Sequence, residues 1–540
     1  MNLYWRKARL HSVFWHPNLQ KRGLRQMKTI EMIYRVTCRY CRQAFGLMEE
    51  LRRSNEKYEK IEIRFLDTER DRELPAGRKF TYVPCFYIDG EMVMEGVPTK
   101  EKIEAVFIQA LQDTESRERR DRTCNKLLRE EIMLALGCTE PGTIAYAAAC
   151  AKEILGDIPE YMEIWVSGNI LKNVKSVIIP NTGNLKGVAE AAFCGIVGGN
   201  PKRKLEVLNT LTANDADTVR KLVREESTYS IHLAEVEEPL YVRIDLRKGE
   251  HTALVEIQKS HIHITKVQKD GRDITKQYQR RECVGSTQTN EDDLKLKDIY
   301  EFAGETSTAE LKDILDMQIA CNRKIAEEGM KNDYGAKVGK NLLRLYKEED
   351  AAVLAAYAAA GSDARMGGSV LPVVANCGSG NQGITIAVPI SIYAEKKDKS
   401  REALHRAMIF ANLISIYIKR GIGKLSAYCG AVNAGCAAVC GIAYLDQAPL
   451  AVMEDIITNT LATISGMLCD GAKPSCAAKI AMSVETGLLA YEMAKNQCRF
   501  MEGEGIVGKN ADETIEAVGR IGKDGMRETD SKILEIMMGN

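Results

Sequence analysis

The stretch KTIEMIYRVTCRYCRQAFGLMEELRRS, residues 28–54, decides the fold of the first part of this chain. The apolar residues from Ile30 to Tyr34 predict a short strand, and the apolar spacing after Cys41 predicts an amphipathic helix. Cys38 would lie at the start of that helix, where free N–H groups and the helix dipole stabilise a thiolate, and Cys41 one turn later. The stretch predicts a strand, a reactive Cys-x-x-Cys pair and a helix.

A second motif follows at residues 80–96, FTYVPCFYIDGEMVMEG, which predicts a strand pair with a hairpin at Asp89-Gly90. With it, residues 28–112 resemble the glutaredoxin/thioredoxin family, whose cis-proline loop corresponds to Val83-Pro84. The resemblance implies an α/β fold and thiol–disulfide exchange at Cys38 and Cys41. Half of a zinc site is the alternative for such a pair, but no second ligand pair lies nearby with suitable spacing. Cys85 leaves the choice of resolving thiol open.

Length, charge and cysteine content bound the whole chain. Its 540 residues predict two to four domains, and its zero net charge argues against nucleic acid or a membrane surface as partner. No apolar run is long enough to span a bilayer. Residues 1–27 form a basic arm without the pattern of a secretory signal, so we expect a cytoplasmic protein whose 16 cysteines are reduced. The charged residues 113–123 predict a linker or a solvated helix at a domain boundary.

Residues 124–540 predict a second, mostly helical module with a β-rich insert at about 205–300. The fold class is therefore α+β and multidomain. Two helical patterns break at GCTEP, residues 137–141, which places Cys138 before a helix N-terminus and predicts a lowered thiol pKa. His261 and His263 are assigned to packing or to the surface. GSGNQG, residues 378–383, satisfies a dinucleotide pattern, but the β-branched residues and Pro389 that follow argue against the required helix.

Three cysteines of this module have a spacing that suits a metal centre. Cys436 lies in AYCGAVNAGCAAVCG, residues 427–441, and Cys469 and Cys476 flank the turn DGAKPS. Two ligands from one loop and one from a neighbouring helix could hold three corners of an iron–sulfur cube. Zinc would prefer four nitrogen or sulfur ligands. Three small buried side chains in close helical packing would give the same spacing, so the spacing alone leaves these possibilities open.

Six motifs together resemble the L-cysteine desulfidase family, relatives of the iron–sulfur L-serine dehydratases, over residues 124–540. They are GCTEP, VSGNILKNVKSVIIPNTG, ANCGSGNQGIT, GKLSAYCGAVNAGC, CDGAKPSCAAKIA and GMRETDSKILEIM. The resemblance implies a [4Fe–4S] cluster on Cys436, Cys469 and Cys476, no pyridoxal phosphate, and a lyase that converts L-cysteine and water to pyruvate, ammonia and sulfide. It also implies that Cys138 is the base. Cys377 in NCGSGNQG, and Cys429 and Cys440, which flank Cys436, are alternatives for the ligand set.

Candidate groups for the substrate carboxylate are polar side chains in the glycine- and asparagine-rich motifs and one lysine beside the cysteines: Asn181, Thr182, Asn381, Gln382 and Lys473. The expected partner is a small amino acid, with cystine or another disulfide at the redox domain. L-Serine dehydratase activity and a non-enzymatic iron–sulfur or thiol sensor are the alternatives. The sequence leaves open the oligomeric state, including a homo-oligomer, and the start codon, since Met27 precedes the first regular pattern.

Overall fold

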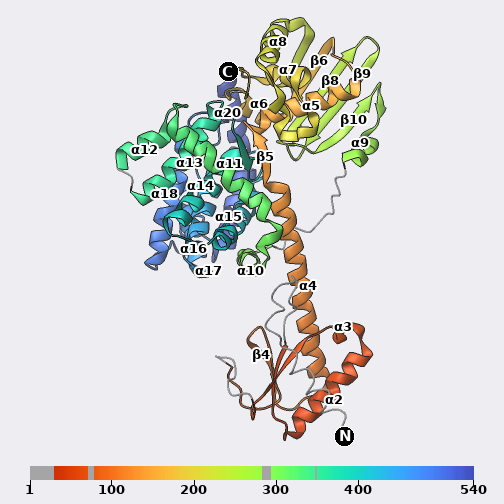
Figure 1. Ribbon diagram of the computed structural model, residues 1–540, viewed down its shortest axis with the longest axis vertical. Coiled ribbons are helices and arrows are strands. Elements are labelled where there is room, and N and C mark those ends of the chain that lie inside the picture. Colours follow the sequence, from red (N-terminus) through yellow and green to blue (C-terminus); the bar gives the residue numbers. More distant parts are fainter. Residues whose placement is uncertain (1–29, 71–77, 283–293, 347–348, 540) are drawn as a thin grey trace. The chain divides into compact units, whose positions relative to one another are not determined.

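The computed structural model describes residues 30–70, 78–282, 294–346 and 349–539 (Figure 1). The predicted basic arm at 1–27 lies outside the described residues. The chain divides into two compact units, residues 1–122 and 123–540. Helix α4 (Lys100–Glu131) includes the whole predicted linker at 113–123, so the boundary between the two units falls within a helical segment of the chain.

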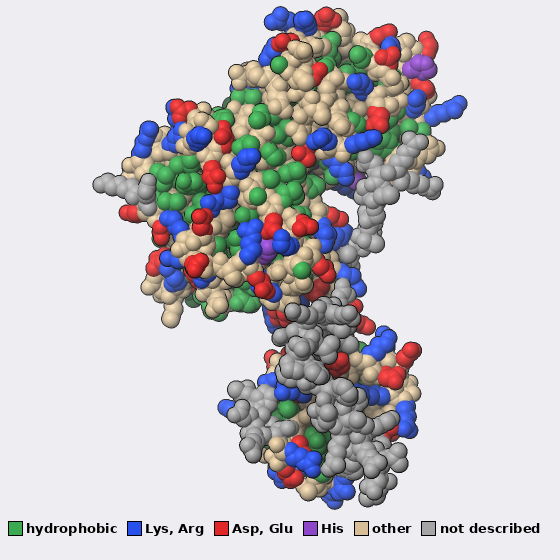
Figure 2. Space-filling model, in the orientation of Figure 1, with side chains coloured by type: hydrophobic (Ala, Val, Ile, Leu, Met, Phe, Trp, Pro, Cys, Tyr) green, Lys and Arg blue, Asp and Glu red, His purple; other side chains and the backbone are tan. Residues whose placement is uncertain are grey.

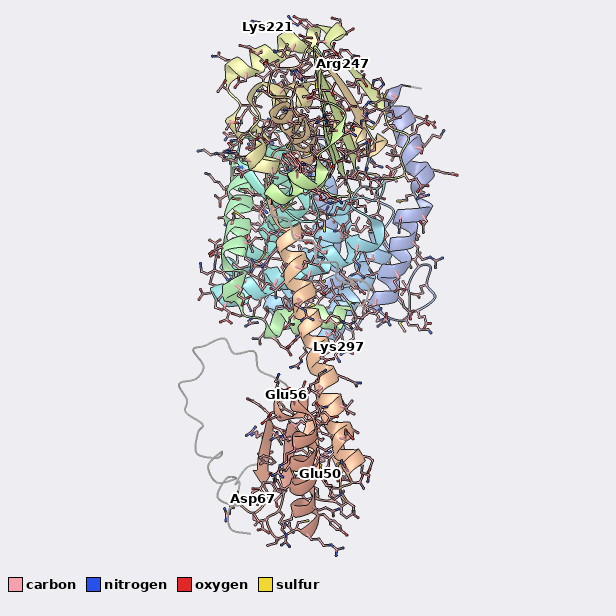
Figure 3. The ribbon with its side chains drawn as sticks, turned by 90° about the vertical axis from the view of Figure 1, so that its right-hand side faces the viewer. Glu50, Glu56, Asp67, Lys221, Arg247 and Lys297 are labelled. Atoms are coloured by element: carbon pink, nitrogen blue, oxygen red, sulfur yellow. The ribbon has the colours of Figure 1, made fainter. Side chains whose placement is uncertain are left out.

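The first unit contains a four-stranded sheet in the order β2-β1-β3-β4. Its strands β1 (Ile30–Tyr34) and β2 (Ile63–Asp67) are parallel, and β3 (Cys85–Ile88) pairs antiparallel with β1 and with β4 (Glu91–Glu95). The helices are α2 (Arg39–Ser54), α3 (Glu56–Glu59) and the start of α4. Glu50 on α2 (Figure 3) pairs with Lys100, the first residue of α4, at 2.7 Å.

The predicted strands, helix and turn of this unit are confirmed where the structure describes them. The Val83-Pro84 peptide bond is cis, and Asp89 and Gly90 both have positive φ, as a tight hairpin turn requires. β3 is buried along its whole length because it lies between β1 and β4. The unit is a thioredoxin-like α/β fold.

A six-stranded sheet in the order β11-β10-β9-β8-β6-β7 forms one part of the second unit. It contains β6 (Tyr161–Val166), β7 (Tyr229–Leu233), β8 (Tyr241–Lys248), β9 (His251–Gln258), β10 (Ile264–Lys269) and β11 (Arg272–Asp273). The associated helices are α5 (Thr139–Leu155), α6 (Gly168–Val174), α7 (Val188–Gly198), η2 (Pro201–Thr210), α8 (Ala213–Arg224), η3 (Glu226–Thr228) and α9 (Thr275–Glu282). The sheet therefore extends beyond the predicted insert at 205–300, because β6 precedes that range and residues 201–224 are helical.

The rest of the second unit is helical and includes one short strand pair, β5 (Met133–Leu136) with β12 (Pro372–Ala375). Its helices are α10 (Leu296–Glu305), η5 (Thr308–Glu310), α11 (Lys312–Lys331), α12 (Val338–Tyr346), α13 (Asp350–Met366), α14 (Gly380–Lys396), α15 (Arg401–Ile422), α16 (Gly430–Leu445), α17 (Leu450–Ile464), α18 (Cys476–Lys495), α19 (Ala511–Arg520), η6 (Ile521–Gly525) and α20 (Arg527–Met538). This confirms a mostly helical module after the thioredoxin-like region.

Helix α16 is the centre of this helical core. It packs against α14, α15, α17 and α18, and 14 of its 16 residues are buried. Its composition explains this position, because alanine and glycine let neighbouring helices approach closely; a Cβ at Gly435 would lie 2.6 Å from the Ser483 side chain on α18. Our sequence argument against a helix after GSGNQG is wrong. α14 begins at Gly380 and includes Pro389, since burial on all sides outweighs its weak propensity.

The surface agrees with the neutral net charge. Figure 2 shows Lys and Arg side chains interspersed with Asp and Glu over the visible face. Within the described ranges, none of the helices combines the length and the apolar composition that crossing a bilayer requires.

Candidate functional site

Four helices of the second unit begin at one cavity of about 100 Å³. Cys138 caps α5, Ser379 caps α14, Cys429 caps α16, and Cys476 is the first residue of α18. All four residues line the cavity. Because a helix N-terminus carries unpaired N–H groups and a partial positive charge, this arrangement favours an anionic ligand in the cavity.

Backbone pairing brings Cys429 and Cys469 together. The N–H of Cys469 donates to the carbonyl of Ala427 (2.6 Å), and the N–H of Cys429 donates to the carbonyl of Met467 (3.0 Å). Their thiols also share a hydrogen bond, which is the largest influence that lowers the pKa of Cys469 to about 5 against the effect of burial. The buried ammonium groups of Lys172 and Lys419 lower this pKa further.

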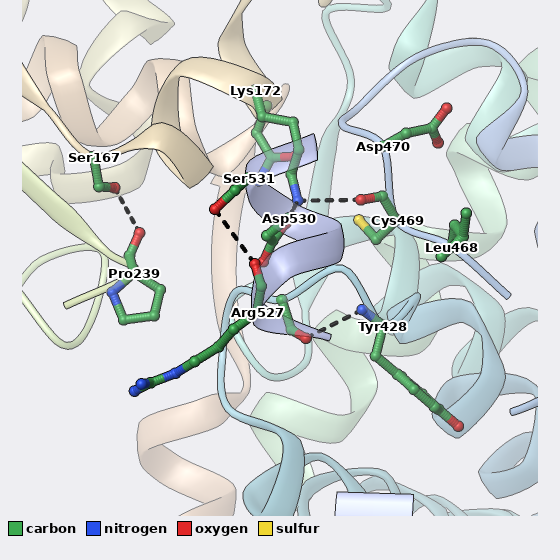
Figure 4. Close-up of polar contacts among 12 residues, drawn as sticks. Ser167, Lys172, Pro239, Tyr428, Leu468, Cys469, Asp470, Arg527, Asp530 and Ser531 are labelled. Carbon is green, nitrogen blue, oxygen red and sulfur yellow. Dashed lines mark hydrogen bonds and ion pairs between the residues drawn. The ribbon is translucent and has the colours of Figure 1, made fainter. Parts of the chain in front are cut away.

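The loop between Cys469 and Cys476 is fixed by contacts with α6 and α20 (Figure 4). Nζ of Lys172 donates to the Cys469 carbonyl at 3.1 Å and pairs with the Asp530 carboxylate at 2.5 Å. Gly471 has a φ of +97°, and a Cβ there would lie 2.4 Å from the Lys172 carbonyl, so only glycine fits this turn. Lys172, in the VSGNILKN motif, thereby holds the backbone of the cysteine loop.

Cys436 does not line this cavity; Cys429 does. The Cys436 side chain is fully buried in α16 and interacts with Cys440. Residues seven apart lie on the same face of a helix but about 10 Å apart along its axis. The sequence spacing therefore could not distinguish the two cysteines, and the structure places the earlier one at the end of α16 that faces Cys469.

The predicted fall in the pKa of Cys138 does not occur. Burial, together with the adjacent Glu140 carboxylate, raises the pKa of the Cys138 thiol well above its usual value. The thiol donates to Oε2 of Glu140 at 3.0 Å. At this position, desolvation and the neighbouring negative charge outweigh the helix N-terminus.

Glu140 is a buried, ionised carboxylate that our sequence reasoning did not single out. Burial by itself would raise its pKa, but the nearby His261 and the bond from Cys138 hold the pKa of Glu140 at about 2. Thr139 Oγ1 donates to Oε2 at 3.0 Å, and Asn173 Nδ2 donates to Oε1 at 3.2 Å. Nε2 of His261 lies 3.9 Å from Oε1.

His261 was assigned to packing or to the surface together with His263. It is buried in the turn between β9 and β10 and lies against Gly378, whereas His263 is exposed. The signal that could have identified Glu140 is its place in the first turn of α5, three residues after a glycine with positive φ. No sequence pattern connects His261 with it, because the contact joins segments more than 100 residues apart.

The predicted carboxylate-binding residues separate into two groups. Asn381 and Gln382 line the cavity. Asn181 and Thr182 form a turn elsewhere: Asn181 donates to the Leu208 carbonyl (3.1 Å) and Thr182 to the Ile179 carbonyl (2.6 Å). Lys473 pairs with Asp470 instead of facing the cavity.

Two buried cations of the cavity wall were missed. Arg365 and Lys419 are both buried and both line the cavity. Arg365 Nε donates to the Gly137 carbonyl at 3.1 Å, while Lys419 lies near the thiols of Cys429 and Cys469. Arg365 lies in the last turn of α13 and Lys419 in the last turn of α15. Basic residues are common in the last turn of a helix and are usually exposed there, so the sequence did not predict that these two are buried.

The donor set at the cavity fits an iron–sulfur cluster. Cys429, Cys469 and Cys476 supply three sulfurs, and soft thiolates suit iron–sulfur centres and zinc. Among the described residues, no group of three or more His, Cys, Asp or Glu side chains is arranged to hold a single metal ion. Thiols spread over a cavity wall and surrounded by lysines suit a larger, negatively charged cluster better than one ion.

The first unit has its own thiol site. Cys38 caps α2, and its thiol lies 3.7 Å from the Val83 carbonyl beside the cis-proline. Burial acts against ionisation, but hydrogen bonds from Cys41 outweigh it and lower the pKa of Cys38. Burial raises the pKa of Cys41 to about 12 and that of Cys85 to about 11. Cys38 is therefore the thiol that ionises first.

Comparison with known proteins agrees with these two units. Residues 202–535 match the serine dehydratase alpha chain family, and residues 28–108 match a thioredoxin domain family. A UPF0597 protein of Finegoldia magna is 44% identical over 419 residues, which cover 76% of this chain and 98% of the relative. UPF0597 proteins of Lachnoclostridium phytofermentans and Desulfitobacterium hafniense are 42% and 41% identical, covering 76% and 78% of this chain and 98% of each relative. The chain belongs to the serine dehydratase alpha chain family, whose members are lyase-type, dehydratase-like enzymes, and carries a thioredoxin-like domain before that region.

Proposed function

We propose that this protein is an iron–sulfur-dependent L-cysteine desulfidase that converts L-cysteine and water to pyruvate, ammonia and sulfide. The observation that carries the proposal is the meeting of Cys429, Cys469 and Cys476 at one cavity with Cys138 and Glu140. Cys429 replaces Cys436 in the proposed ligand set. A [4Fe–4S] cluster on these thiols would supply a Lewis-acidic iron for the leaving group, without pyridoxal phosphate.

The residues of the chain would orient the substrate and handle the proton. Cys138 stays the proposed base: its resting thiol donates to Glu140, and after transfer of the thiol proton to water the thiolate would take the Cα proton. Asn381 and Gln382 lie at the start of α14 and would contact the substrate carboxylate. Lys172 would keep Cys469 in place through its carbonyl.

L-Serine dehydratase activity is the second candidate, and the family match favours it. The products distinguish the two. We would purify the protein without oxygen and measure pyruvate and sulfide from L-cysteine, with L-serine in parallel, before and after exposure to air. Equal amounts of sulfide and pyruvate that disappear after air support the desulfidase; pyruvate from serine alone supports the dehydratase. A bound cluster without any product would contradict both and favour a sensor.

We further propose that the thioredoxin-like unit exchanges disulfides through Cys38, either reducing cystine to supply cysteine or keeping a thiol of the lyase reduced. The lowered pKa of Cys38 beside the cis-proline supports this role. These thiols need a reducing compartment, and we place the protein in the cytoplasm on that ground. Cystine turnover by the intact chain and by Cys38→Ser, with a reductant present, tests the first option; equal rates would remove it.

A further inference from the structure

We propose that Glu140 and Arg365 select the substrate by binding the ammonium and the carboxylate of an α-amino acid zwitterion. The inference rests on the proposed function, since it concerns the same cavity, and it assigns roles to two residues that the family resemblance does not single out. Both side chains line the cavity and are more than 90% buried. They carry opposite charges.

Glu140 has room for one more donor. Its Oε2 accepts from Cys138 and Thr139 and its Oε1 accepts from Asn173, while Nε2 of His261, at 3.9 Å from Oε1, is too far for a hydrogen bond. A carboxylate offers about four acceptor positions. An ammonium group in the cavity would fill the fourth and pair with a carboxylate that has little contact with water, which makes the interaction stronger than at a surface.

A second acceptor belongs to the same cavity. Oδ1 of Asn381 is buried, and no hydrogen-bond partner for it lies within the described parts of the chain. Buried acceptors in proteins are nearly always paired, so an unpaired one at a cavity indicates a missing donor. An amino acid brings such donors in its ammonium group, while the Nδ2 amide of Asn381 stays available for the carboxylate.

Arg365 is a buried cation, and among the described residues it forms an ion pair with neither an Asp nor a Glu side chain. Its Nε donates to the Gly137 carbonyl, and none of the ion pairs found among the described residues involves it. Buried charges are usually paired, because an isolated one is costly to desolvate. The four N–H groups that remain on the guanidinium suit a carboxylate, which can accept two of them at once.

Helix α14 adds to the anion-binding side. A Cβ at Gly380, its first residue, would lie 2.5 Å from Nε of Arg365, so no side chain separates the guanidinium from the first turn of the helix. The free N–H groups of α14 and Arg365 therefore act on the same region. Lys419 is closer to the thiols of Cys429 and Cys469, and we assign its charge to the cluster ligands.

The two charges lie on either side of one turn. Arg365 is bonded to Gly137, and Glu140 follows three residues later, after Cys138. A ligand that spans the turn with its ammonium toward Glu140 and its carboxylate toward Arg365 would present its Cα to the turn itself. We therefore expect a ligand that carries both charges to bind more tightly than a simple acid or a simple amine.

Three small probes without a leaving group test the proposal independently of turnover. L-Alanine carries both charges, propionate only the carboxylate, and ethylamine only the ammonium. Calorimetric titration of the anaerobically purified full chain should show L-alanine binding tighter than either single-charge probe by roughly tenfold to hundredfold. Propionate or ethylamine binding as tightly as L-alanine would overturn the proposal.

The variants assign each charge. Glu140→Gln should lower the affinity for L-alanine toward that for propionate, and it should leave the affinity for propionate unchanged. Arg365→Met should lower the affinity for L-alanine toward that for ethylamine, and it should leave the affinity for ethylamine unchanged. Glu153→Gln, on the exposed side of α5, is the matched control and should bind all three as the parent does. Equal weakening of all probes, or none, would contradict the assignment.

The wild-type series alone decides the question if a variant does not fold. The outcome is also separate from the proposed reaction. Selective, Glu140-dependent binding of L-alanine without any product from L-cysteine would contradict the lyase but keep the zwitterion site. Turnover in a protein whose Glu140→Gln variant binds L-alanine normally would keep the lyase and contradict the site.

Discussion

The ammonium of Lys172 on α6 lies between the carboxylate of Asp530 on α20 and the carbonyl of Cys469, so the last helix of the chain supports the cysteine loop (Figure 4). The Lys172 side chain is 2% exposed and that of Asp530 is 20% exposed. The two ends of the pair therefore differ in their access to water.

We predict that Asp530→Asn destabilises the protein more than Lys172→Met. The first leaves a buried ammonium without a counterion, which costs about 3–5 kcal/mol, whereas the second leaves a carboxylate that water can reach. Chemical unfolding of the parent and both variants measures this. A larger loss for Lys172→Met would show that the contact with the Cys469 carbonyl matters more than the ion pair.

We predict that Cys429→Ala loses most of the bound iron and that Cys436→Ala keeps it. The two changes remove the same atoms from one helix, and only Cys429 faces the cavity. Iron and acid-labile sulfide per chain, determined after anaerobic reconstitution, provide the measurement. Iron lost from Cys436→Ala alone would restore the ligand set expected from the sequence.

We predict that Cys41→Ser traps a mixed disulfide on Cys38. The Cys38 thiolate attacks a disulfide, one half leaves as a thiolate, and Cys41 is the hydrogen-bonded neighbour that would displace the other half. Mass spectrometry after incubation with cystine detects the adduct. Cys85→Ser is the control and should resolve the adduct as the parent does; trapping in that variant instead would make Cys85 the resolving thiol.

We predict that Asp363→Asn stabilises the protein at pH 8 but not at pH 4. Burial raises the pKa of Asp363 to about 6, so the native state binds more protons than the unfolded state between about pH 4 and 6 and loses stability as the pH rises through that range. Above pH 6 the parent bears the full free-energy cost of burying the ionised Asp363 carboxylate, roughly 1–3 kcal/mol, and the Asp363→Asn variant does not. Asparagine still accepts the N–H of Gly339.

Thermal unfolding of the parent and of Asp363→Asn at both pH values checks this prediction. The difference in midpoint should be present at pH 8 and should shrink toward zero at pH 4. An equal difference at the two values would mean that the charge of Asp363 has no part in it.

The thioredoxin-like unit could be predicted from sequence because its decisive features are local. The strand before Cys38, the helix after it, the proline loop and the Asp89-Gly90 turn each occupy a few consecutive residues, and each appears in the structure. The short loop between Cys469 and Cys476 could also be predicted, because it too is a local feature. Propensity failed at α14, where packing on all sides allows a helix that its sequence disfavours.

The sequence by itself determined the two kinds of module, the positions of the cysteine pairs at 38/41 and 469/476, and the relationship of the larger module to the serine dehydratases. Only the tertiary structure decided which end of α16 meets Cys469, that the pKa of Cys138 is raised, that Glu140 lies near His261, and that Glu140 and Arg365 line one cavity. The reason is physical. Burial, pairing of charges and distance along a helix axis depend on contacts between segments that lie far apart in the chain. Local sequence patterns do not predict such contacts.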